Sequence, residues 1–290
     1  MSEVLLETNM LTKNYGDVCA LKDFTVKLDC NKIYGFLGRN GAGKTTFLNI
    51  VSSRIFATDG EVKIFGQDSF NSQEILSKIC YMPEKNLFIG TMRVVEILKS
   101  AALFYNGFDM QYAQELCTKF GLQTKKKYKA LSRGYESILR IVIGLASRAS
   151  LTIFDEPVLG LDAAVRDMFY RELIEDYTNH PRSFIISTHL IEESANMFEE
   201  VVIIKEGSLV KQLPVDELKE MARYVSGKAA SVDEAVAGLN LIHSETVGAT
   251  KICAIFDRLD DEKLKKLTRA DLDLSPIPVQ KLFIYLTSNN

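Results

Sequence analysis

Apolar and polar residues alternate along the first part of the chain in the way that β-strands require. Residues 4–11 and 21–28 both place apolar side chains at about every second position, which predicts two strands that each bury one face. Residues 14–17 read Asn-Tyr-Gly-Asp, a composition typical of a turn. A short apolar run at Ile33–Leu37 predicts a further strand that is buried on both faces.

Farther along, the hydrophobic period changes from two residues to the period of a helix. Between about residues 91 and 148, apolar residues recur at helical spacing, which predicts a helical block. Before this block, Asn71 and Glu74 are spaced as a helix-capping box. After it, strand candidates at 151–154, 183–187 and 201–205 alternate with helical segments, and this alternation predicts a mostly parallel sheet in an α/β fold.

Pro214 ends the alternation of strands and helices. The residues that follow contain too many apolar side chains for a disordered tail and predict a small accessory domain. The predicted domains are therefore residues 1–213, with a helical subdomain at about 85–148, and an α/β accessory domain at 214–290.

Composition narrows the possible classes of protein. The 290 residues are 47% hydrophobic and 25% charged, with a net charge of −3, so we expect a globular chain that does not bind nucleic acid. No run approaches the roughly 20 apolar residues of a membrane-spanning helix, and the first residues lack the pattern of a secretory signal. The five cysteines form no CxxC pair, which predicts neither zinc nor disulfides. Cys19 and Cys30 are expected in the core.

Residues 38–45 read GRNGAGKT and match the phosphate-binding pattern GxxxxGKS/T. The pattern follows the strand candidate Ile33–Leu37 and precedes a helical segment, which is the context that a phosphate loop needs. Its backbone N–H groups and the helix N-terminus bind phosphates, the Lys44 amine reaches the β- and γ-phosphates, and the Thr45 hydroxyl binds Mg²⁺. The predicted ATP-binding residues of this segment are Gly38, Arg39, Asn40, Gly41, Ala42, Gly43, Lys44, Thr45 and Thr46.

Two further strands end in residues that suit phosphate chemistry. The apolar strand 151–154 is followed by Asp155 and Glu156, and carboxylates at this end of a parallel sheet lie where nucleotides bind. Asp155 is predicted to hold Mg²⁺ through water, and Glu156 to act as general base. His189 follows the strand candidate 183–187 and is predicted to reach the γ-phosphate. The predicted catalytic residues are Glu156, His189 and Lys44.

The order of these motifs resembles that of the ATPase subunit of an ABC transporter, from about Val4 to Leu213. Tyr15 lies where that family has an aromatic residue that stacks on adenine. Residues 131–134, Leu-Ser-Arg-Gly, are similar to the LSGGQ signature, residues 160–162 resemble the D-loop, and residues 187–189 resemble the switch-histidine segment. The resemblance implies a P-loop, RecA-like α/β fold with an N-terminal antiparallel β-subdomain and an inserted helical subdomain.

The resemblance also adds site residues. It implies that Ser132, Gly134 and Asp162 bind nucleotide. Glu84 occupies the position where many relatives have a glutamine that helps to hold Mg²⁺, and a glutamate can still bind the metal. Arg133 replaces one of the two glycines of the signature, which places an additional cation near the triphosphate.

The resemblance implies that the chain hydrolyses ATP with Mg²⁺ to drive transport, as part of an exporter. Segments such as Tyr81–Glu84 are most similar to those of ATPases that pair with ABC-2-type permeases. The implied partners are a separately encoded membrane permease, which would hold the chain at the cytoplasmic face of the cell membrane, and a second ATPase subunit, identical or related. ATP would lie between residues 38–45 of one subunit and 132–134 of the other.

Two other classes of function were weighed against this interpretation. An ABC-type ATPase that acts on DNA or ribosomes would carry long coiled coils or two cassettes, whereas the interval between phosphate loop and signature here is about 90 residues without sustained heptads. A regulatory module that binds ATP without turnover would not need the general base Glu156 or the histidine His189.

Overall fold

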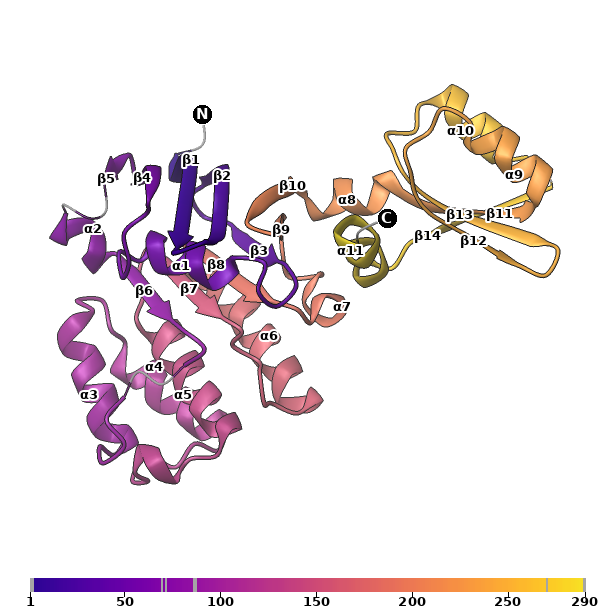
Figure 1. Cartoon of the computed structure of the whole chain (residues 1–290). Helices are drawn as coiled ribbons and strands as arrows, with labels where there is room; N and C mark the ends of the chain where they lie inside the picture. Colours follow the sequence, from indigo (N-terminus) through magenta and orange to yellow (C-terminus); the bar gives the residue numbers. More distant parts are fainter. Residues whose placement is uncertain (1–2, 69, 71, 86–87, 270, 289–290) are drawn as a thin grey trace. The chain divides into compact units, whose positions relative to one another are not determined.

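The computed structural model describes residues 3–68, 70, 72–85, 88–269 and 271–288 (Figure 1). The chain divides into two compact units. The first consists of Met1–His189 with Glu200–Gln212, and the second of Leu190–Glu199 with Leu213–Asn290. The second unit thus includes a segment before residue 200 that the sequence analysis did not assign to it.

The first unit begins with a four-stranded sheet in the order β2-β1-β4-β5. Strands β1 and β2 form an antiparallel hairpin around the predicted turn, and β4 pairs antiparallel with the other edge of β1. The strands are β1 (Val4–Tyr15), β2 (Val18–Asp29), β4 (Asp59–Ile64) and β5 (Gln67–Asp68). This sheet is the antiparallel subdomain that the resemblance implied.

The second sheet of this unit has six strands in the order β10-β9-β3-β8-β7-β6. The strands are β3 (Ile33–Leu37), β6 (Ile79–Met82), β7 (Leu151–Asp155), β8 (Ser183–Thr188), β9 (Glu200–Lys205) and β10 (Ser208–Pro214). The pairs β3·β8, β3·β9, β6·β7 and β7·β8 are parallel. Parallel pairing brings the carboxyl ends of β3, β6, β7 and β8 to one edge of the sheet, and each predicted catalytic segment follows one of these ends.

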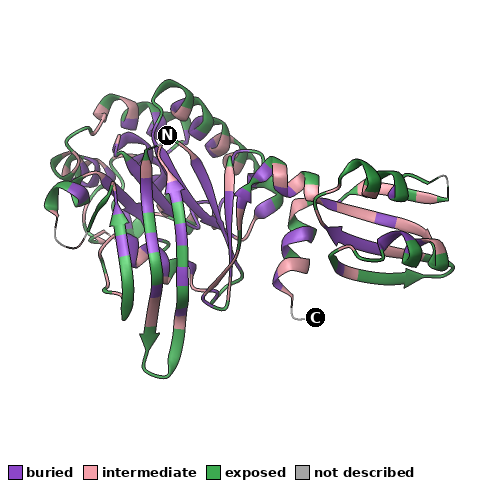
Figure 2. Ribbon diagram, turned by 90° about the horizontal axis from the view of Figure 1, so that it is seen from above, coloured by how far each residue is buried: buried purple, intermediate pink, exposed green. Residues whose placement is uncertain are grey.

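Three helices accompany the strands of the first unit, namely α1 (Lys44–Val51), α2 (Gln73–Ser77) and α6 (Ala163–Asn179). Fully buried Phe24, Phe36 and Phe47 come from β2, β3 and α1, and the rings of Phe36 and Phe47 stack with centroids 4.7 Å apart. Figure 2 shows the buried residues concentrated on the strands. The capping prediction for α2 was misplaced: Ser72 is the cap, since its side chain accepts from the Ile75 N–H at 3.2 Å, while Asn71 lies outside the described residues.

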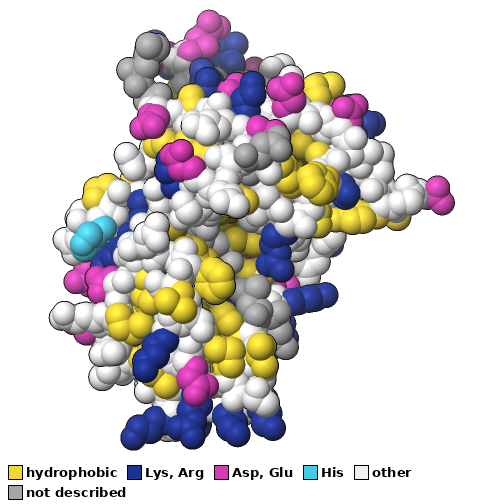
Figure 3. Space-filling model, turned by 90° about the vertical axis from the view of Figure 1, so that its left-hand side faces the viewer, with side chains coloured by type: hydrophobic (Ala, Val, Ile, Leu, Met, Phe, Trp, Pro, Cys, Tyr) yellow, Lys and Arg dark blue, Asp and Glu magenta, His cyan; other side chains and the backbone are white. Residues whose placement is uncertain are grey.

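The predicted helical block consists of α3 (Val94–Phe104), α4 (Met110–Lys119), the short 3₁₀-helix η2 (Tyr128–Ala130) and α5 (Arg133–Ala146). Figure 3 shows Lys and Arg side chains gathered along the lower end of this block. Residues 125–127, a run of three lysines, are all exposed. The block is therefore helical and carries a basic surface at one end.

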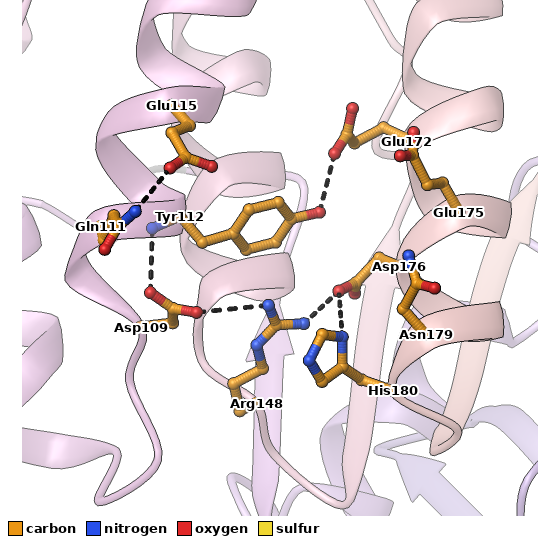
Figure 4. A pocket seen from close by; sticks show the side chains of 10 residues that line it. All are labelled: Asp109, Gln111, Tyr112, Glu115, Arg148, Glu172, Glu175, Asp176, Asn179 and His180. Atoms are coloured by element: carbon orange, nitrogen blue, oxygen red, sulfur yellow. Dashed lines mark hydrogen bonds and ion pairs between the residues drawn. The ribbon is translucent and has the colours of Figure 1, made fainter.

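A network of charged side chains joins the helical block to α6 around a cavity of about 340 Å³ (Figure 4). Arg148 pairs with Asp176 and, at 3.3 Å, with Asp109. The Tyr112 hydroxyl donates to Glu172 at 2.9 Å. The Asp176 side chain is only 1% exposed, and its ion pairs with Arg148 and, at 2.5 Å, with Arg182 make its burial tolerable.

The second unit contains a four-stranded sheet in the order β12-β13-β11-β14, and the three strand pairs are antiparallel. Its elements are α7 (Ile191–Ser194), α8 (Val215–Met221), β11 (Ala222–Lys228), α9 (Ala229–Val236), β12 (Leu241–Val247), β13 (Thr250–Phe256), α10 (Asp261–Leu267), β14 (Leu272–Pro276) and α11 (Val279–Thr287). From β11 to β14 the succession is βαββαβ, the ferredoxin-like arrangement. Val225, Val232, Cys253, Ile255 and Leu267 form its core.

All five cysteines are free. The prediction that Cys19 and Cys30 are core residues was wrong: Cys19 is exposed and Cys30 is half-buried. They lie near the two ends of the β2 strand region, where alternation alone does not guarantee burial. Within the described ranges, no helix is both long enough and apolar enough to span a membrane.

Candidate functional site

The loop between β3 and α1 adopts a conformation that only glycine tolerates easily at two positions. Gly41 and Gly43 have φ angles of 82° and 108°, which lie in the left-handed region. A Cβ atom at Gly43 would lie 2.5 Å from the Ala20 carbonyl oxygen. The loop therefore turns tightly at the N-terminus of α1, as a phosphate loop must.

This loop borders a cavity of about 260 Å³. The lining residues are Ala20, Arg39, Asn40, Gly41, Ala42, Gly43, Lys44, Thr45, Thr46, Glu84 and Glu156. All but Ala20 had been predicted as site residues. Ala20 has no polar side chain and belongs to none of the phosphate- or metal-binding motifs, so the sequence did not indicate it.

Lys44 is the buried cation of the cavity, at 6% exposed. Its ammonium donates to the Gly38 carbonyl at 2.6 Å and lies 3.6 Å from Glu156 Oε1. A buried ammonium needs anionic or carbonyl partners. Lys44 thus provides a positive charge next to the turned loop, which favours binding of an anion.

Asp155, at the end of β7, is 1% exposed and accepts hydrogen bonds from three hydroxyl groups. Thr45 Oγ1 donates to its Oδ2 at 2.8 Å, Ser187 donates to its Oδ1, and the Tyr81 hydroxyl lies 3.4 Å from Oδ2. Burial, with the Asp155 charge, raises the pKa of Tyr81, so Tyr81 stays a donor. These hydroxyls hold the Asp155 carboxylate in one orientation toward Thr45.

The donor set near Thr45 and Asp155 is suited to Mg²⁺, which prefers hard oxygen ligands. Among the residues that the structure describes, no group of three or more His, Cys, Asp or Glu side chains gathers as a metal cage. Mg²⁺ in nucleotide sites is held by one or two side chains together with phosphate oxygens. The Thr45 hydroxyl and the Asp155 carboxylate are in contact beside the loop at residues 38–45, and this arrangement fits such a way of holding Mg²⁺.

Glu156 and His189 follow the neighbouring strands β7 and β8. His189 Nδ1 lies 2.8 Å from Glu156 Oε2, and Glu156 Oε1 is buried without a hydrogen bond. The backbone of Glu156 has a φ of 49°, a left-handed conformation that is strained for a residue with a side chain. Its N–H is fixed by the Ser187 carbonyl at 3.0 Å. The strain aims the carboxylate into the cavity beside Lys44.

Glu84 also borders the cavity, and Arg133 Nη2 donates to its Oε1 at 3.2 Å. Both residues depart from the family pattern, Glu84 at the glutamine position and Arg133 in the signature. The sequence analysis treated them separately. Tertiary structure places them in contact.

The remaining predicted ATP-binding residues lie outside the cavity of the single chain. Tyr15 is 50% exposed at the end of β1. Ser132 caps α5 by accepting from the Tyr135 N–H at 3.4 Å, and Asp162 caps α6 by accepting from the Val165 N–H at 2.9 Å. Gly134 packs against the loop before α6, because a Cβ there would lie 2.9 Å from the Gly160 carbonyl oxygen.

The sequence analysis missed Ser187 and Tyr81 as partners of Asp155. Ser187 directly follows the apolar run Phe184–Ile186 of β8, and the change from apolar to polar residues was the available signal. Tyr81 gave none, since an aromatic residue in a buried strand is most simply explained by packing.

Comparisons with known proteins show the family of the chain. A family model described as ABC transporter matches residues 21–159. The chain is 28% identical to the ABC transporter ATP-binding protein YtrB of Bacillus subtilis, over 97% of both chains. It is 32% identical to the bacitracin transport ATP-binding protein BcrA of Bacillus licheniformis, over 91% of this chain and 89% of that protein. A solved ATP-binding subunit of an ABC transporter superposes with a TM-score of 0.66 at 24% identity, covering 74% of this chain and 91% of that one.

The fold and the site define a P-loop ATPase with an inserted helical subdomain. The chain belongs to the ATP-binding subunits of ABC transporters. It binds ATP and hydrolyses it to drive transport across a membrane, which confirms the expected fold, activity and general function.

Proposed function

We propose that the chain is the ATPase subunit of an exporter that pairs with a separately encoded ABC-2-type permease. Support comes from relatives that are named for the transport of peptide antibiotics. One is BcrA, and another is the lantibiotic transport ATP-binding protein SrtF of Streptococcus pyogenes, 27% identical over 73% of this chain and 92% of that protein. The permease would hold the chain at the cytoplasmic face of the membrane and would dock on the helical block between Glu84 and Leu131.

The observation that carries the proposal is the cluster of Lys44, Thr45, Asp155, Glu156 and His189 at one edge of the parallel sheet. The loop N–H groups and the Lys44 ammonium would bind the β- and γ-phosphates. Thr45 and Asp155, with Glu84 at the cavity border, would hold Mg²⁺. Bound Mg²⁺ would offset the negative charge of the phosphate oxygens.

Glu156 would act as general base in hydrolysis. Its carboxylate takes a proton from water while the water oxygen forms a bond to the γ-phosphorus. The bond from that phosphorus to the β–γ bridging oxygen breaks, which leaves ADP and phosphate. His189 would donate a hydrogen bond to the γ-phosphate oxygens as negative charge shifts in the transition state. The contact between Nδ1 and Glu156 fixes the position of its ring.

We further propose that two subunits, identical or related, bind ATP between them. Ser132, Gly134 and Asp162 lie outside the cavity of their own chain and would contribute to the site of the second subunit. The N-terminus of α5, capped by Ser132, would offer donors to the γ-phosphate. Tyr15, exposed at the end of β1, would stack on adenine.

The functional domains in this proposal are a cassette at residues 1–213 and an accessory domain at 214–290. The test combines two measurements on the full chain. MgATP hydrolysis should occur in the purified wild-type protein. Vesicles that contain the permease encoded beside this chain should bind it in flotation, whereas vesicles without the permease should not. Equal binding to both kinds of vesicle would contradict the pairing.

A further inference from the structure

One face of α5 binds two loops of the site. Arg133, Ser137 and Arg140 are spaced i, i+4 and i+7 along the helix, so they lie on one stripe. Two of these residues bind the loop at Pro83–Glu84 that follows β6. The stripe also contacts the loop at Leu159–Gly160 that follows Glu156.

Arg140 fixes the backbone of the first loop. Its guanidinium is 5% exposed and donates to the Pro83 carbonyl at 2.7 Å and to Ser137 Oγ at 2.8 Å. Ser137 Oγ in turn donates to the Leu159 carbonyl at 2.8 Å. Because a buried arginine must keep its partners, this chain of bonds ties both loops to α5.

Arg133 fixes the side chain of the next residue, Glu84. Its guanidinium donates to the Glu84 carboxylate at 3.2 Å. Its aliphatic stem passes over Gly160, where an added Cβ would lie 3.3 Å from Arg133 Cγ. Gly160 has a φ of 83°, in the left-handed region. This backbone conformation and the close approach of Arg133 both favour glycine at position 160.

We propose that Arg133 is a positioning residue that holds the Glu84 carboxylate at the border of the phosphate cavity and offsets its charge. The inference rests on the proposed role of this cavity as the triphosphate site. Without Arg133, the charge of Glu84 would be offset only by Mg²⁺, and its excess negative charge beside Glu156 would oppose binding of a triphosphate. The Glu84–Arg133 ion pair is exposed and contributes little to folding, so its effect falls on nucleotide affinity.

The test is a double-mutant cycle on the full chain, with the affinity for MgATP measured by titration calorimetry at fixed salt. With Glu84 present, Arg133→Gln should weaken binding by about three- to tenfold, in the lower range of coupling between residues of one network. In the Glu84→Gln background, the same change should alter affinity by less than about twofold. Arg133→Lys, which keeps the charge, should retain most of the affinity.

The matched control is Arg171→Gln, which removes an exposed ion pair to Asp167 on α6 at 2.9 Å and should leave affinity unchanged. An equal loss from Arg133→Gln in both backgrounds would overturn the inference, because Arg133 would then act independently of Glu84. Lys44→Ala separates the two proposals. If it binds MgATP as well as wild type, the assignment of the cavity itself fails. If it loses binding while the cycle is additive, only the role of Arg133 fails.

Discussion

Glu156 Oε2 and His189 Nδ1 lie 2.8 Å apart, although 33 positions separate the two residues in the chain. They meet because β7 and β8 are adjacent and parallel, with Asp155 paired to Ser187. The contact occupies Nδ1 of His189 and one carboxylate oxygen of Glu156. The other oxygen, Oε1, faces Lys44 at 3.6 Å, so the proposed general base and the proposed phosphate-binding cation lie side by side.

Glu156→Gln should stop hydrolysis while ATP binding persists. The amide keeps the shape of the side chain but cannot take a proton from water, and it no longer repels the triphosphate. We expect kcat to fall by about 10²- to 10⁴-fold, the usual contribution of a general base, with equal or tighter binding. An ATPase assay beside a binding titration checks this. Hydrolysis at the wild-type rate would show that Glu156 is not the base.

The same variant tests the sharing of ATP between subunits. Because Glu156→Gln retains ATP, it should form dimers with MgATP in gel filtration with multi-angle light scattering. Ser132→Arg, added to Glu156→Gln, should abolish the ATP-dependent dimer, since it blocks the contact to the partner's phosphate. If the dimer persists in that double variant, Ser132 does not contact the shared nucleotide.

Lys44→Ala should remove most nucleotide affinity and turnover. The change deletes the buried ammonium beside Gly38 and Glu156, and the triphosphate loses its nearest positive charge. We expect an affinity loss of at least about tenfold, since hydrogen bonds to charged groups contribute about 1.5–3 kcal/mol. Fluorescent-nucleotide binding measures the loss, with circular dichroism as the control for folding. Wild-type turnover in this variant would refute the phosphate-loop assignment.

Gly144→Ala should destabilise the first unit even though alanine favours helices. An added Cβ on α5 would lie 2.4 Å from two ring atoms of Phe154 on β7. Such overpacking typically costs about 1–3 kcal/mol, which outweighs the gain of about 1 kcal/mol in helix propensity. Urea denaturation measures the free energy of unfolding. The cost should shrink in a Phe154→Leu background, and an equal cost there would assign it to another cause.

Asp109→Asn should lower stability at neutral pH but not in acid. Asp109 caps α4 through the Tyr112 N–H, and this bond, together with Arg148, holds the pKa of Asp109 below its ordinary value. A lowered carboxyl pKa contributes stability above the unfolded value of about 3.9, and the contribution is lost as pH falls through the folded pKa. Melting temperatures of wild type and variant should therefore differ at pH 7 and converge below about pH 4. A gap that stays constant with pH would show that the Asp109 charge is not involved.

Local patterns predicted many of the helices and strands of the first unit and which segments border the cavity beside Lys44. The bounds of β3 and β6 match the apolar runs at Ile33–Leu37 and Ile79–Met82, because strands buried on both faces leave uninterrupted apolar segments. The loop at residues 38–45 could be predicted as a phosphate loop because its glycines, the start of the helix and the Lys-Thr pair all lie within eight adjacent residues. Asp155 and Glu156 were readable for a similar reason, since they directly follow a buried strand.

Contacts between distant segments were decided only by tertiary structure. Hydrophobic periodicity reports which side chains are buried, but it does not report which strands become neighbours. The strand order places Tyr81 and Ser187 on either side of Asp155 in the sheet, and packing of α5 against the Pro83 loop joins Arg133 to Glu84. Each such contact depends on the free energy of the whole packed core, so it has no signature in the residues immediately around it.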